Sequence, residues 1–253
     1  MPTSLSELVR YADEFLRCSD YKDYCPNGLQ VEGREQVSRL ATGVSASQAL
    51  LDAAIEWGAD AIVVHHGYFW QGERAEVVGM KRRRLAALLG SDVSLLAYHL
   101  PLDGHPQVGN NARLGQLLGL EQWAPLQPGV PASVGNIGSL AVAQSAGELV
   151  RRLEQILGRE ALHIGDPTSL VCRIGWCTGA AQGYIDAALA AGADMFITGE
   201  ASEQTVHTAR EEGIHFVAAG HHATERYGVQ ALGEHLAEKF ALEQRFFDLD
   251  NPV

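Results

Sequence analysis

The sequence predicts an α/β fold in which two similar α/β domains face each other across a cleft. Three observations support this prediction: apolar runs typical of strands alternate with helical patterns, a segment of the first half recurs in the second, and histidines and acids follow the predicted strands. Alternation of strands and helices is typical of a parallel sheet with crossover helices. We expect the first domain over residues 1–126 and the second over residues 127–253, because prolines and glycines cluster between Gln122 and Asn136.

The first domain opens with a helix expected over residues 4–17. Ser4 and Glu7 form a capping box there, and apolar residues recur at helical spacing. A loop rich in turn formers, DYKDYCPNGLQVEG, comes next. The pattern then predicts, in order, the strand RLATGVS, a helix SQALLDAAIEW ended by Gly58, the strand DAIVVHH, a helix over residues 81–89 and the strand VSLLAYH.

The second half of the chain repeats part of the first. GVSASQALLDAAIEWGADAIVVHHG (residues 43–67) aligns with GWCTGAAQGYIDAALAAGADMFITGE (residues 175–200), with a two-residue insertion at the start. Four positions match at an offset of 134, namely Asp52, Gly58, Asp60 and His66 with Asp186, Gly192, Asp194 and Glu200. A weaker echo at an offset of 122 matches His99 and Asp103 with His221 and Glu225. The alternative is a chance likeness, because short α/β segments often look similar.

Composition restricts the classes of protein to which this chain can belong. It has 253 residues, of which 46% are hydrophobic and 20% charged, and this suits a globular protein with a large core. No signal-peptide or membrane-spanning segment is evident, so we expect a cytoplasmic protein with no membrane partner. Four scattered cysteines favour reduced thiols over disulfides or a zinc finger. A net charge of −12 argues against nucleic acid as a partner.

One basic run departs from this acidic balance. Lys81, Arg82, Arg83 and Arg84 are consecutive at the start of a predicted helix. The run is either a solvated helix face or a docking patch for an anionic substrate or partner.

Histidines and acids stand at the ends of the predicted strands, where open α/β sheets bind their ligands. A single histidine there is more often structural than a ligand. Convergence from both halves instead favours a metal site, because borderline divalent ions prefer mixed nitrogen and oxygen ligands. The residues at these ends are His65, His66, His99, Asp103, His105, Glu200, His221, His222 and Glu225.

The adjacent pair His65 and His66 poses a geometric question, because neighbouring side chains on a strand point to opposite faces. At the last strand position, just before Gly67 lets the chain turn, both imidazoles can reach the crevice while diverging. Such divergence suits two metal ions, which share bridging carboxylates or a bridging water. Asp103 and Glu225 are the obvious carboxylates.

The last long helix is expected to start near Ala223 or Thr224, as judged from its apolar stripe. His221 would then lie in the preceding loop and Glu225 in the first turn, where the helix dipole favours a carboxylate. The alternative is an ordinary N-terminal glutamate and a loop histidine that bind no metal.

Taken together, these motifs resemble a known family, the GTP cyclohydrolase 1 type 2 homologs, also called the Nif-three-like dinuclear-metal proteins. The segments VVHHG, AYHLPLDGHPQVGNNARL, FITGEASEQTVHTARE and GHHATERYGVQAL are similar to that family's motifs, in its order, over essentially the whole chain. The resemblance implies two similar α/β domains, a dinuclear metal site in the cleft between them and a toroidal homohexamer. The proline-rich join leads straight into the second half, so the chain resembles the short form without an inserted domain.

Carried over residue by residue, the resemblance implies metal ligands at His65, His66, Asp103, His221 and Glu225, with Glu225 as the bridge. Other residues are left to orient ligands or transfer protons, with His99 and His222 as the first choices for proton transfer. The remaining members of this group are Glu200, His105 and His207. Two divalent ions per chain are expected, and Zn, Fe, Mn, Co and Ni all suit these ligands.

The expected chemistry is hydrolysis by a metal-bridged hydroxide, because two ions lower the pKa of bound water and polarise the substrate. The family name suggests a nucleotide substrate, GTP. The chain has no glycine-rich phosphate loop, so cations such as Lys81 to Arg84 would have to bind the phosphates. One alternative is a metal-binding or metal-delivery hexamer that docks partners without turnover. Another is a DNA-acting metal nuclease, which would need a basic channel.

Overall fold

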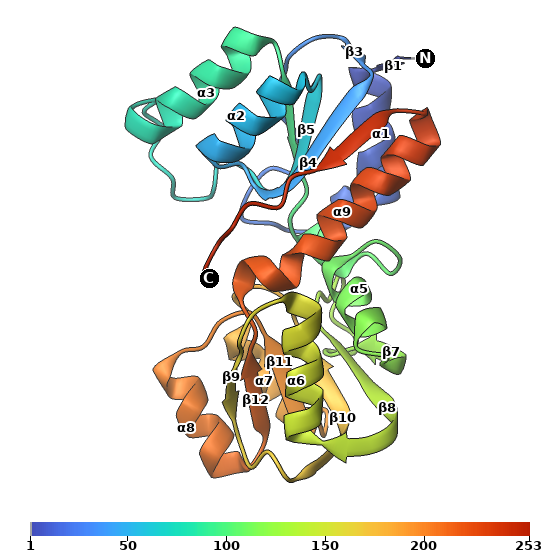
Figure 1. Cartoon of the computed structure of the whole chain (residues 1–253), viewed down its shortest axis with the longest axis vertical. Coiled ribbons are helices and arrows are strands. Elements are labelled where there is room, and N and C mark those ends of the chain that lie inside the picture. Colours follow the sequence, from blue (N-terminus) through green and yellow to red (C-terminus); the bar gives the residue numbers. More distant parts are fainter. Residues whose placement is uncertain (1) are drawn as a thin grey trace. The chain divides into compact units, whose positions relative to one another are not determined.

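The computed structural model describes residues 2–253 and has an α/β fold with two compact units, each with its own main sheet (Figure 1). Unit 1 extends to Leu102 and also contains Gly228–Asp250, whereas unit 2 contains Asp103–Tyr227 and Asn251–Val253. The division expected between residues 126 and 127 lies inside unit 2, where β7 (Glu121–Pro125) pairs with β8 (Asn136–Ser145). That division remains a prediction about the two halves of the sequence.

Unit 1 is built on a five-stranded sheet with the order β13-β4-β5-β6-β2. Its central strands β4 (Arg39–Ser45), β5 (Ala61–His66) and β6 (Ser94–Ala97) are parallel, so their carboxyl ends lie at the same edge. The outer strands are β13 (Glu243–Phe246), parallel to β4, and β2 (Gly28–Val31), antiparallel to β6. A small ribbon pairs β1 (Thr3–Ser4) with β3 (Gln36–Val37).

Helices cover both faces of the sheet of unit 1 (Figure 1). Helices α2 (Gln48–Trp57) and α3 (Gly79–Ser91) lie on one face, and α1 (Leu5–Phe15) lies on the other with the unit 1 part of α9 (His221–Phe240). The apolar side chains of β5 are fully buried, as expected for a central parallel strand between two helix layers. Ser4 caps α1 by accepting a hydrogen bond from the Glu7 N–H at 3.2 Å. This helix ends earlier than expected because Arg17 adopts a left-handed conformation, with φ of 54°.

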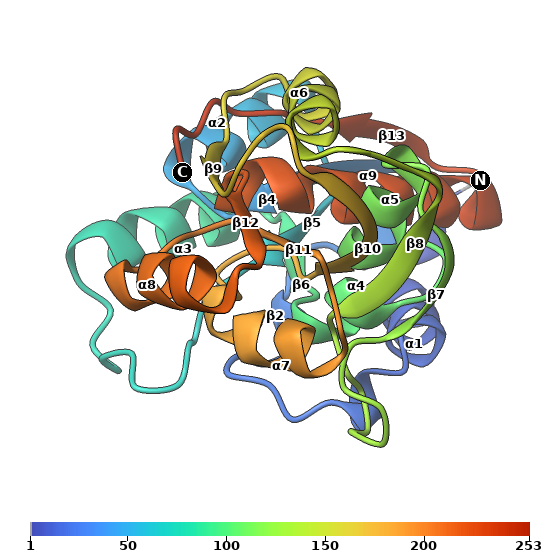
Figure 2. The ribbon, with the colours of Figure 1, turned by 90° about the horizontal axis from the view of Figure 1, so that it is seen from below.

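Unit 2 has a six-stranded sheet with the order β7-β8-β10-β11-β12-β9. Its parallel strands are β10 (Leu170–Trp176), β11 (Met195–Thr198) and β12 (His215–Ala218), and β9 (Leu162–Ile164) is an antiparallel edge strand. Figure 2 shows α6 (Ala146–Leu157) on one side of this sheet and α7 (Ile185–Ala190) and α8 (Glu203–Glu212) on the other. Two shorter helices, α4 (Leu100–Gly104) and α5 (Asn110–Leu117), follow β6 along the chain.

Hydrogen bonds reproduce the sequence repeat inside each unit. An aspartate just before the second parallel strand accepts two backbone N–H hydrogen bonds of 2.8–2.9 Å, from Ser38 and Arg39 to Asp60 in unit 1 and from Cys172 and Arg173 to Asp194 in unit 2. All three positions differ by 134, which is the offset of the sequence repeat. The likeness therefore extends to the same local structure, which a chance match of short segments does not explain.

The strand register corrects the start of that alignment. Leu40 pairs with Ala61 in unit 1 and Ile174 with Met195 in unit 2, which continues the offset of 134 into the first strand. The expected two-residue insertion is therefore wrong. It came from aligning Gly43 with Gly175, whereas by the strand register Gly43 corresponds to Cys177.

The weaker match between the two halves, at an offset of 122, is also wrong, because the true offset is smaller by one residue. Ala61 pairs with Ser94 in unit 1, and Met195 pairs with His215 in unit 2, so the third parallel strands correspond at an offset of 121. By this register His99 corresponds to Gly220 rather than to His221. The two histidines thus occupy different positions after their strands.

Among residues 2–253, no helix is both long enough and apolar enough to cross a lipid bilayer.

Candidate functional site

Three imidazoles of unit 1 gather at the carboxyl ends of β5 and β6. One ring nitrogen from each of His65, His66 and His99 lies within 4.8 Å of those of the other two. The ring centroids of His65 and His66 are 4.5 Å apart, and those of His65 and His99 are 5.1 Å apart. Neighbouring residues of β5 thus present their imidazoles to a common region at the point where β5 ends. Three imidazoles at this spacing are a ligand set that suits Zn and similar ions.

Hydrogen bonds orient each of the three rings through its Nδ1 atom. The Nδ1–H of His65 donates to the Tyr98 carbonyl at 2.9 Å, which fixes its tautomer, since a carbonyl can only accept. His66 Nδ1 shares a hydrogen bond of 3.1 Å with the Ser45 hydroxyl. A metal ion would consequently bind His65 and His66 through Nε2, with Nδ1 held by a neighbour.

The third ring is oriented by Asp23, a residue that was not predicted from the sequence. His99 Nδ1–H donates to Asp23 Oδ1 at 2.7 Å, and the Asp23 side chain is only 3% exposed. Burial raises the pKa of Asp23, but hydrogen bonds from His99, from Asn27 and from the Leu100 N–H outweigh it and lower the pKa to about 2. The carboxylate is therefore charged at neutral pH. The only sequence signal was its place in a loop of turn-forming residues.

A second group of potential ligands in unit 1, Asp23, Cys25 and His99, suits a metal less well. Burial raises the pKa of the Cys25 thiol to about 12, and the charge of Asp23 contributes to this rise. A thiol must lose its proton to bind a metal. His99 also already uses Nδ1 to hold Asp23.

The aromatic segment after His66 is held by two members of the basic run. The Lys81 ammonium lies over the Phe69 ring at 5.3 Å, and the Arg84 guanidinium lies over the Tyr68 ring at 6.0 Å. Trp70 comes next in this segment, and its ring centroid is 5.0 Å from that of His99. Lys81 and Arg84 thus pack against the aromatic segment that follows His66, a role that neither sequence-based interpretation included.

Two buried carboxylates, Asp103 and Glu225, lie close together in unit 2. They are 6% and 2% exposed, and an oxygen of one lies within 4.8 Å of an oxygen of the other. Asp103 Oδ1 accepts hydrogen bonds from Asn110 Nδ2 at 2.8 Å and from the Thr178 hydroxyl at 3.3 Å. Two anionic groups this close in a buried place repel each other, so a divalent cation would be favoured beside them.

His221 lies beside Glu225 in the first turn of α9. The helix begins at His221, whereas the sequence suggested a start at Ala223 or Thr224; that expectation was wrong because Gly220, with φ of +100°, turns the chain early. The Thr224 N–H accordingly donates to the Gly220 carbonyl at 3.1 Å. His221 and Glu225 are therefore four residues apart on one helix, and His221 Nε2 lies 3.2 Å from Glu225 Oε2.

Glu200 orients the His221 ring in the same way that Asp23 orients His99. The Nδ1–H of His221 donates to Glu200 Oε1 at 2.6 Å, which directs Nε2 toward Glu225. Burial lowers the pKa of His221, but Glu225 and Glu200 outweigh it and raise the pKa to about 9. The protonated ring offsets part of the repulsion between the carboxylates. A metal ion and this proton would compete for Nε2.

Gly179 leaves space beside these ligands. A Cβ at this position would lie 2.1 Å from Glu225 Oε1 and 3.2 Å from His221 Nε2. Any side chain there would therefore displace the carboxylate. The space beside Gly179 is thus too small for a methyl group. It is bordered by nitrogen and oxygen donors, and this combination suits a bound divalent ion.

The other histidines named from the sequence differ in their surroundings. His105 is buried, and its Nδ1 accepts hydrogen bonds from the Gln107 and Val108 N–H groups at 3.3 and 3.2 Å, which is a turn-forming role. His222 follows His221 in α9, and its N–H donates to the Val253 carbonyl. His207 is exposed on α8 and, within residues 2–253, belongs to no group of three potential metal ligands.

The chain is similar to proteins of a single family over its whole length. The model of the Duf34/NIF3 family (NGG1p interacting factor 3) matches residues 3–252. A protein of Pseudomonas aeruginosa named GTP cyclohydrolase 1 type 2 homolog is 60% identical over 253 residues, which cover 100% of both chains. A protein of the same name from Escherichia coli K12 is 51% identical, over 98% of this chain and 99% of its own.

Solved structures agree with this relationship. The structure of a protein called ybgI, described as of unknown function, is 49% identical, has a TM-score of 0.95 and covers 99% of this chain and 100% of its own. That of the protein TTHA1606 from Thermus thermophilus is 35% identical, has a TM-score of 0.88 and covers 99% of this chain and 100% of its own.

Proposed function

Because the chain belongs to the Duf34/NIF3 family, we propose that it is a metal-dependent hydrolase that holds two divalent ions. The proposed ligands are His65, His66, Asp103, His221 and Glu225, with Glu225 shared by both ions. The observation that carries the proposal is that each unit gathers potential ligands and orients them with its own hydrogen bonds. Residues that orient a metal ligand are typical of working metal sites, since they fix the ring and its tautomer.

Bound divalent ions would supply a water of lowered pKa and would polarise the substrate oxygen. The protein's own contribution is to move the proton. His99 is suited to this, because Asp23 fixes its tautomer and stabilises the imidazolium that forms when it accepts a proton. His222 is the second candidate.

The substrate we propose is a small molecule, and the names of the relatives favour a nucleotide such as GTP. A second candidate function uses the same ligands without turnover: a metal-binding or metal-delivery scaffold. For either function we propose a cytoplasmic homohexamer, for which the evidence is the resemblance of the sequence motifs.

Turnover separates the enzyme from the scaffold. Protein purified without chelator would be reloaded in turn with Mn, Zn, Fe, Co or Ni and offered GTP, other nucleotides and generic phosphoester and amide substrates. We expect hydrolysis with at least one metal and none with the metal-free protein. Tight, exchangeable metal binding without turnover of any substrate would instead favour the scaffold.

The variant Asp23→Asn is expected to lower kcat by about 100-fold or more, because correctly positioned acid–base groups contribute roughly 10²- to 10⁴-fold. The asparagine amide can donate to Nδ1, so His99 would carry its proton on Nε2 and could not accept another. Metal content should stay at the wild-type level.

Asp20→Asn is the matched control, since Asp20 is exposed and pairs with Arg17 at 2.5 Å, away from the imidazoles. Equal kcat in the Asp23→Asn and Asp20→Asn variants would exclude His99 as the proton acceptor.

A further inference from the structure

Two aromatic side chains of unit 1 border the His99 ring, and the proposed metal chemistry gives them no role. The ring centroid of Trp70 is 5.0 Å from that of His99, with the planes at 81°, and the ring centroid of Tyr24 is 6.3 Å from it. Tyr24 is 60% exposed, and its hydroxyl makes no hydrogen bond with any of residues 2–253. We call Tyr24 and Trp70 the aromatic pair. Two aromatic surfaces thus adjoin the imidazole to which we assign the proton transfer.

Hydrogen bonds hold the Trp70 ring in one orientation. Its indole N–H donates to the Gly67 carbonyl at 3.1 Å, and its backbone N–H donates to Glu73 Oε2 at 3.2 Å. Lys81 fixes Glu73 in turn, because its ammonium lies 3.2 Å from Glu73 Oε1 and donates to the Arg74 carbonyl at 2.9 Å. A ring that is already in place when a ligand arrives loses little conformational entropy on binding. Trp70 therefore presents a pre-organised aromatic surface.

The backbone also joins Trp70 to the loop that carries Tyr24. The N–H of Gln71, the residue after Trp70, donates to the Tyr24 carbonyl at 2.6 Å. Asp23, the residue before Tyr24, accepts the hydrogen bond from His99 Nδ1–H at 2.7 Å. The aromatic pair and His99 consequently belong to one hydrogen-bonded arrangement, so a molecule that contacts the pair lies beside the imidazole.

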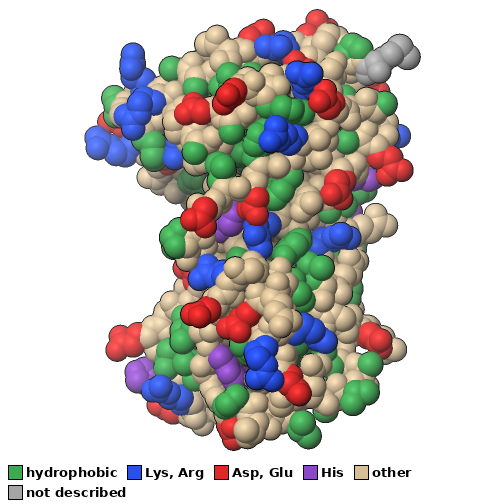
Figure 3. Space-filling model, viewed as in Figure 1, with side chains coloured by type: hydrophobic (Ala, Val, Ile, Leu, Met, Phe, Trp, Pro, Cys, Tyr) green, Lys and Arg blue, Asp and Glu red, His purple; other side chains and the backbone are tan. Residues whose placement is uncertain are grey.

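The basic run offers little to hold the phosphates of a substrate. Lys81 and Arg84 pack on aromatic rings, and Lys81 also pairs with Glu73. Arg82 and Arg83 are exposed on α3, over which Figure 3 shows Lys and Arg side chains gathered. Ion pairs at exposed positions contribute little, because water and salt screen them. Recognition of a substrate by unit 1 therefore needs other groups.

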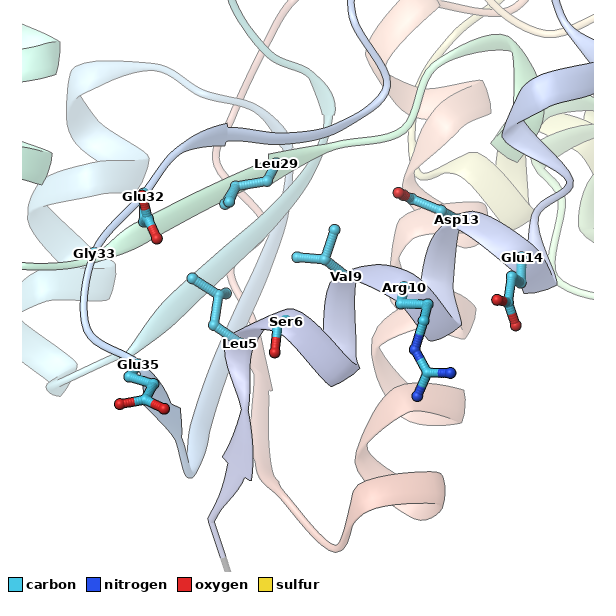
Figure 4. A pocket seen from close by; sticks show the side chains of 10 residues that line it. All are labelled: Leu5, Ser6, Val9, Arg10, Asp13, Glu14, Leu29, Glu32, Gly33 and Glu35. Carbon is cyan, nitrogen blue, oxygen red and sulfur yellow. The ribbon is translucent and has the colours of Figure 1, made fainter.

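Another place in unit 1 has room for a small molecule. It is a cavity of about 680 Å³ between α1, the end of β2 and the loop that follows β2 (Figure 4). Leu5, Val9 and Leu29 supply apolar lining. Its charged lining has four carboxylates and one cation, namely Asp13, Glu14, Glu32, Glu35 and Arg10. We call it the acidic groove, and its excess of negative charge disfavours an anionic substrate such as a nucleotide.

We propose that the aromatic pair binds a planar heteroaromatic ring of the substrate by stacking, with that ring beside His99. Aromatic side chains accept any nucleobase in this way, because every base has a π-face. Tyrosine adds a polar tip to its apolar ring, so the Tyr24 hydroxyl is suited to hydrogen-bond the edge of the bound ring. The inference rests on the proposed function, since that function brings a substrate to the imidazoles, and it adds the two residues that recognise the substrate's ring.

Isothermal titration calorimetry of the full-length protein with guanosine tests the proposal, because guanosine has a base and no phosphate. The wild type should bind guanosine and adenosine and should not bind ribose, which lacks the base. Trp70→Leu and Tyr24→Ala should each weaken guanosine binding by about 5- to 150-fold, the factor that corresponds to the usual stacking contribution of one aromatic side chain. Trp70→Phe keeps an aromatic face and should retain most of the affinity.

Matched variants separate stacking from other effects. Trp57→Leu removes a half-buried tryptophan that precedes β5, whereas the imidazoles lie at the end of that strand, and it should bind guanosine as the wild type does. Val9→Trp fills the acidic groove and should also leave the affinity unchanged. Lys81→Ala removes the partner of Glu73 and should weaken guanosine binding less than Trp70→Leu does, and Arg82→Ala should not weaken it. Circular dichroism and metal content should be unchanged in all of them.

Three results would overturn the proposal: no binding of either nucleoside by the wild type, wild-type affinity in folded Trp70→Leu, or a loss of affinity in Val9→Trp that matches the loss in Trp70→Leu. If Trp70→Leu fails to fold, Tyr24→Ala decides, because that side chain is mostly exposed. Failure of the proposed function looks different. Guanosine binding through the aromatic pair without hydrolysis of any substrate would refute the hydrolase alone, whereas hydrolysis with unchanged guanosine affinity in Trp70→Leu would refute the aromatic pair alone.

Discussion

Replacing Glu225 with alanine is expected to reduce the metal content of the purified chain from about two ions to one or none. Glu225 is 2% exposed, lies within 4.8 Å of Asp103 and is 3.2 Å from His221, so it is placed to share its carboxylate between two ions. Loss of a residue that merely supports a ligand costs about 10- to 100-fold in metal affinity, and loss of a shared ligand should cost more.

Elemental analysis after purification without chelator gives the stoichiometry, and competition with a chromophoric chelator gives the affinity. Thermal unfolding supplies a separate measure, because an ion at 100 times its dissociation constant stabilises the folded state by about 2.7 kcal/mol. Added metal should raise the Tm of the wild type and should raise that of Glu225→Ala much less.

The control is His207→Ala, which removes a potential metal ligand that lies exposed on α8. This replacement should leave the metal content unchanged. His66→Ala should lose metal in the same assay. Two ions per chain retained by Glu225→Ala, with wild-type affinity, would remove Glu225 from the ligand set and with it the shared carboxylate on which the mechanism depends.

Much of the fold follows from local patterns in the sequence. The alternation of β4, α2, β5, α3 and β6 was evident because buried parallel strands are short apolar runs and α2, between the first two of them, buries Leu50, Leu51 and Ala54. The repeat was equally evident, since the Asp60 and Asp194 carboxylates perform the same local task and so keep the same spacing.

Contacts between distant parts of the chain could not be predicted in this way. β13 pairs with β4 across roughly two hundred residues, so the last segment of the chain joins unit 1 rather than unit 2. No local pattern records such a pairing. Likewise β7 and β8 form a hairpin across the proline-rich stretch that the sequence suggested as a join between domains.

The residues of the candidate site likewise divide into those that local sequence patterns reveal and those that depend on distant parts of the chain. His65 and His66 were recognisable because a polar pair at the end of an apolar strand is unusual. Asp23 was not, because its partner His99 is 76 positions away and an aspartate in a turn-rich loop has an ordinary local explanation. The start of α9 was missed because it depends on the backbone of Gly220, whereas the apolar stripe of the helix begins later.

Gly179→Ala is expected to lower metal affinity at least about tenfold, although no proposed ligand is changed. The added Cβ would lie 2.1 Å from Glu225 Oε1, so the carboxylate would have to move. Gly179 also has φ of +71°, where a side chain costs about 1–2 kcal/mol. Gly213→Ala is a matched control, because Gly213 has φ of +72° and a Cβ there would meet nothing within 4 Å.

The two variants should therefore lose similar stability in the metal-free state, since the backbone cost is common to both. Glu225 ends in a flexible side chain, so the clash at residue 179 is relieved mainly by rotating the carboxylate rather than by unfolding. The difference between the variants should then appear in metal titrations and not in metal-free unfolding. Equal metal affinities would mean that the carboxylate can leave its position without consequence, which a shared metal ligand cannot do.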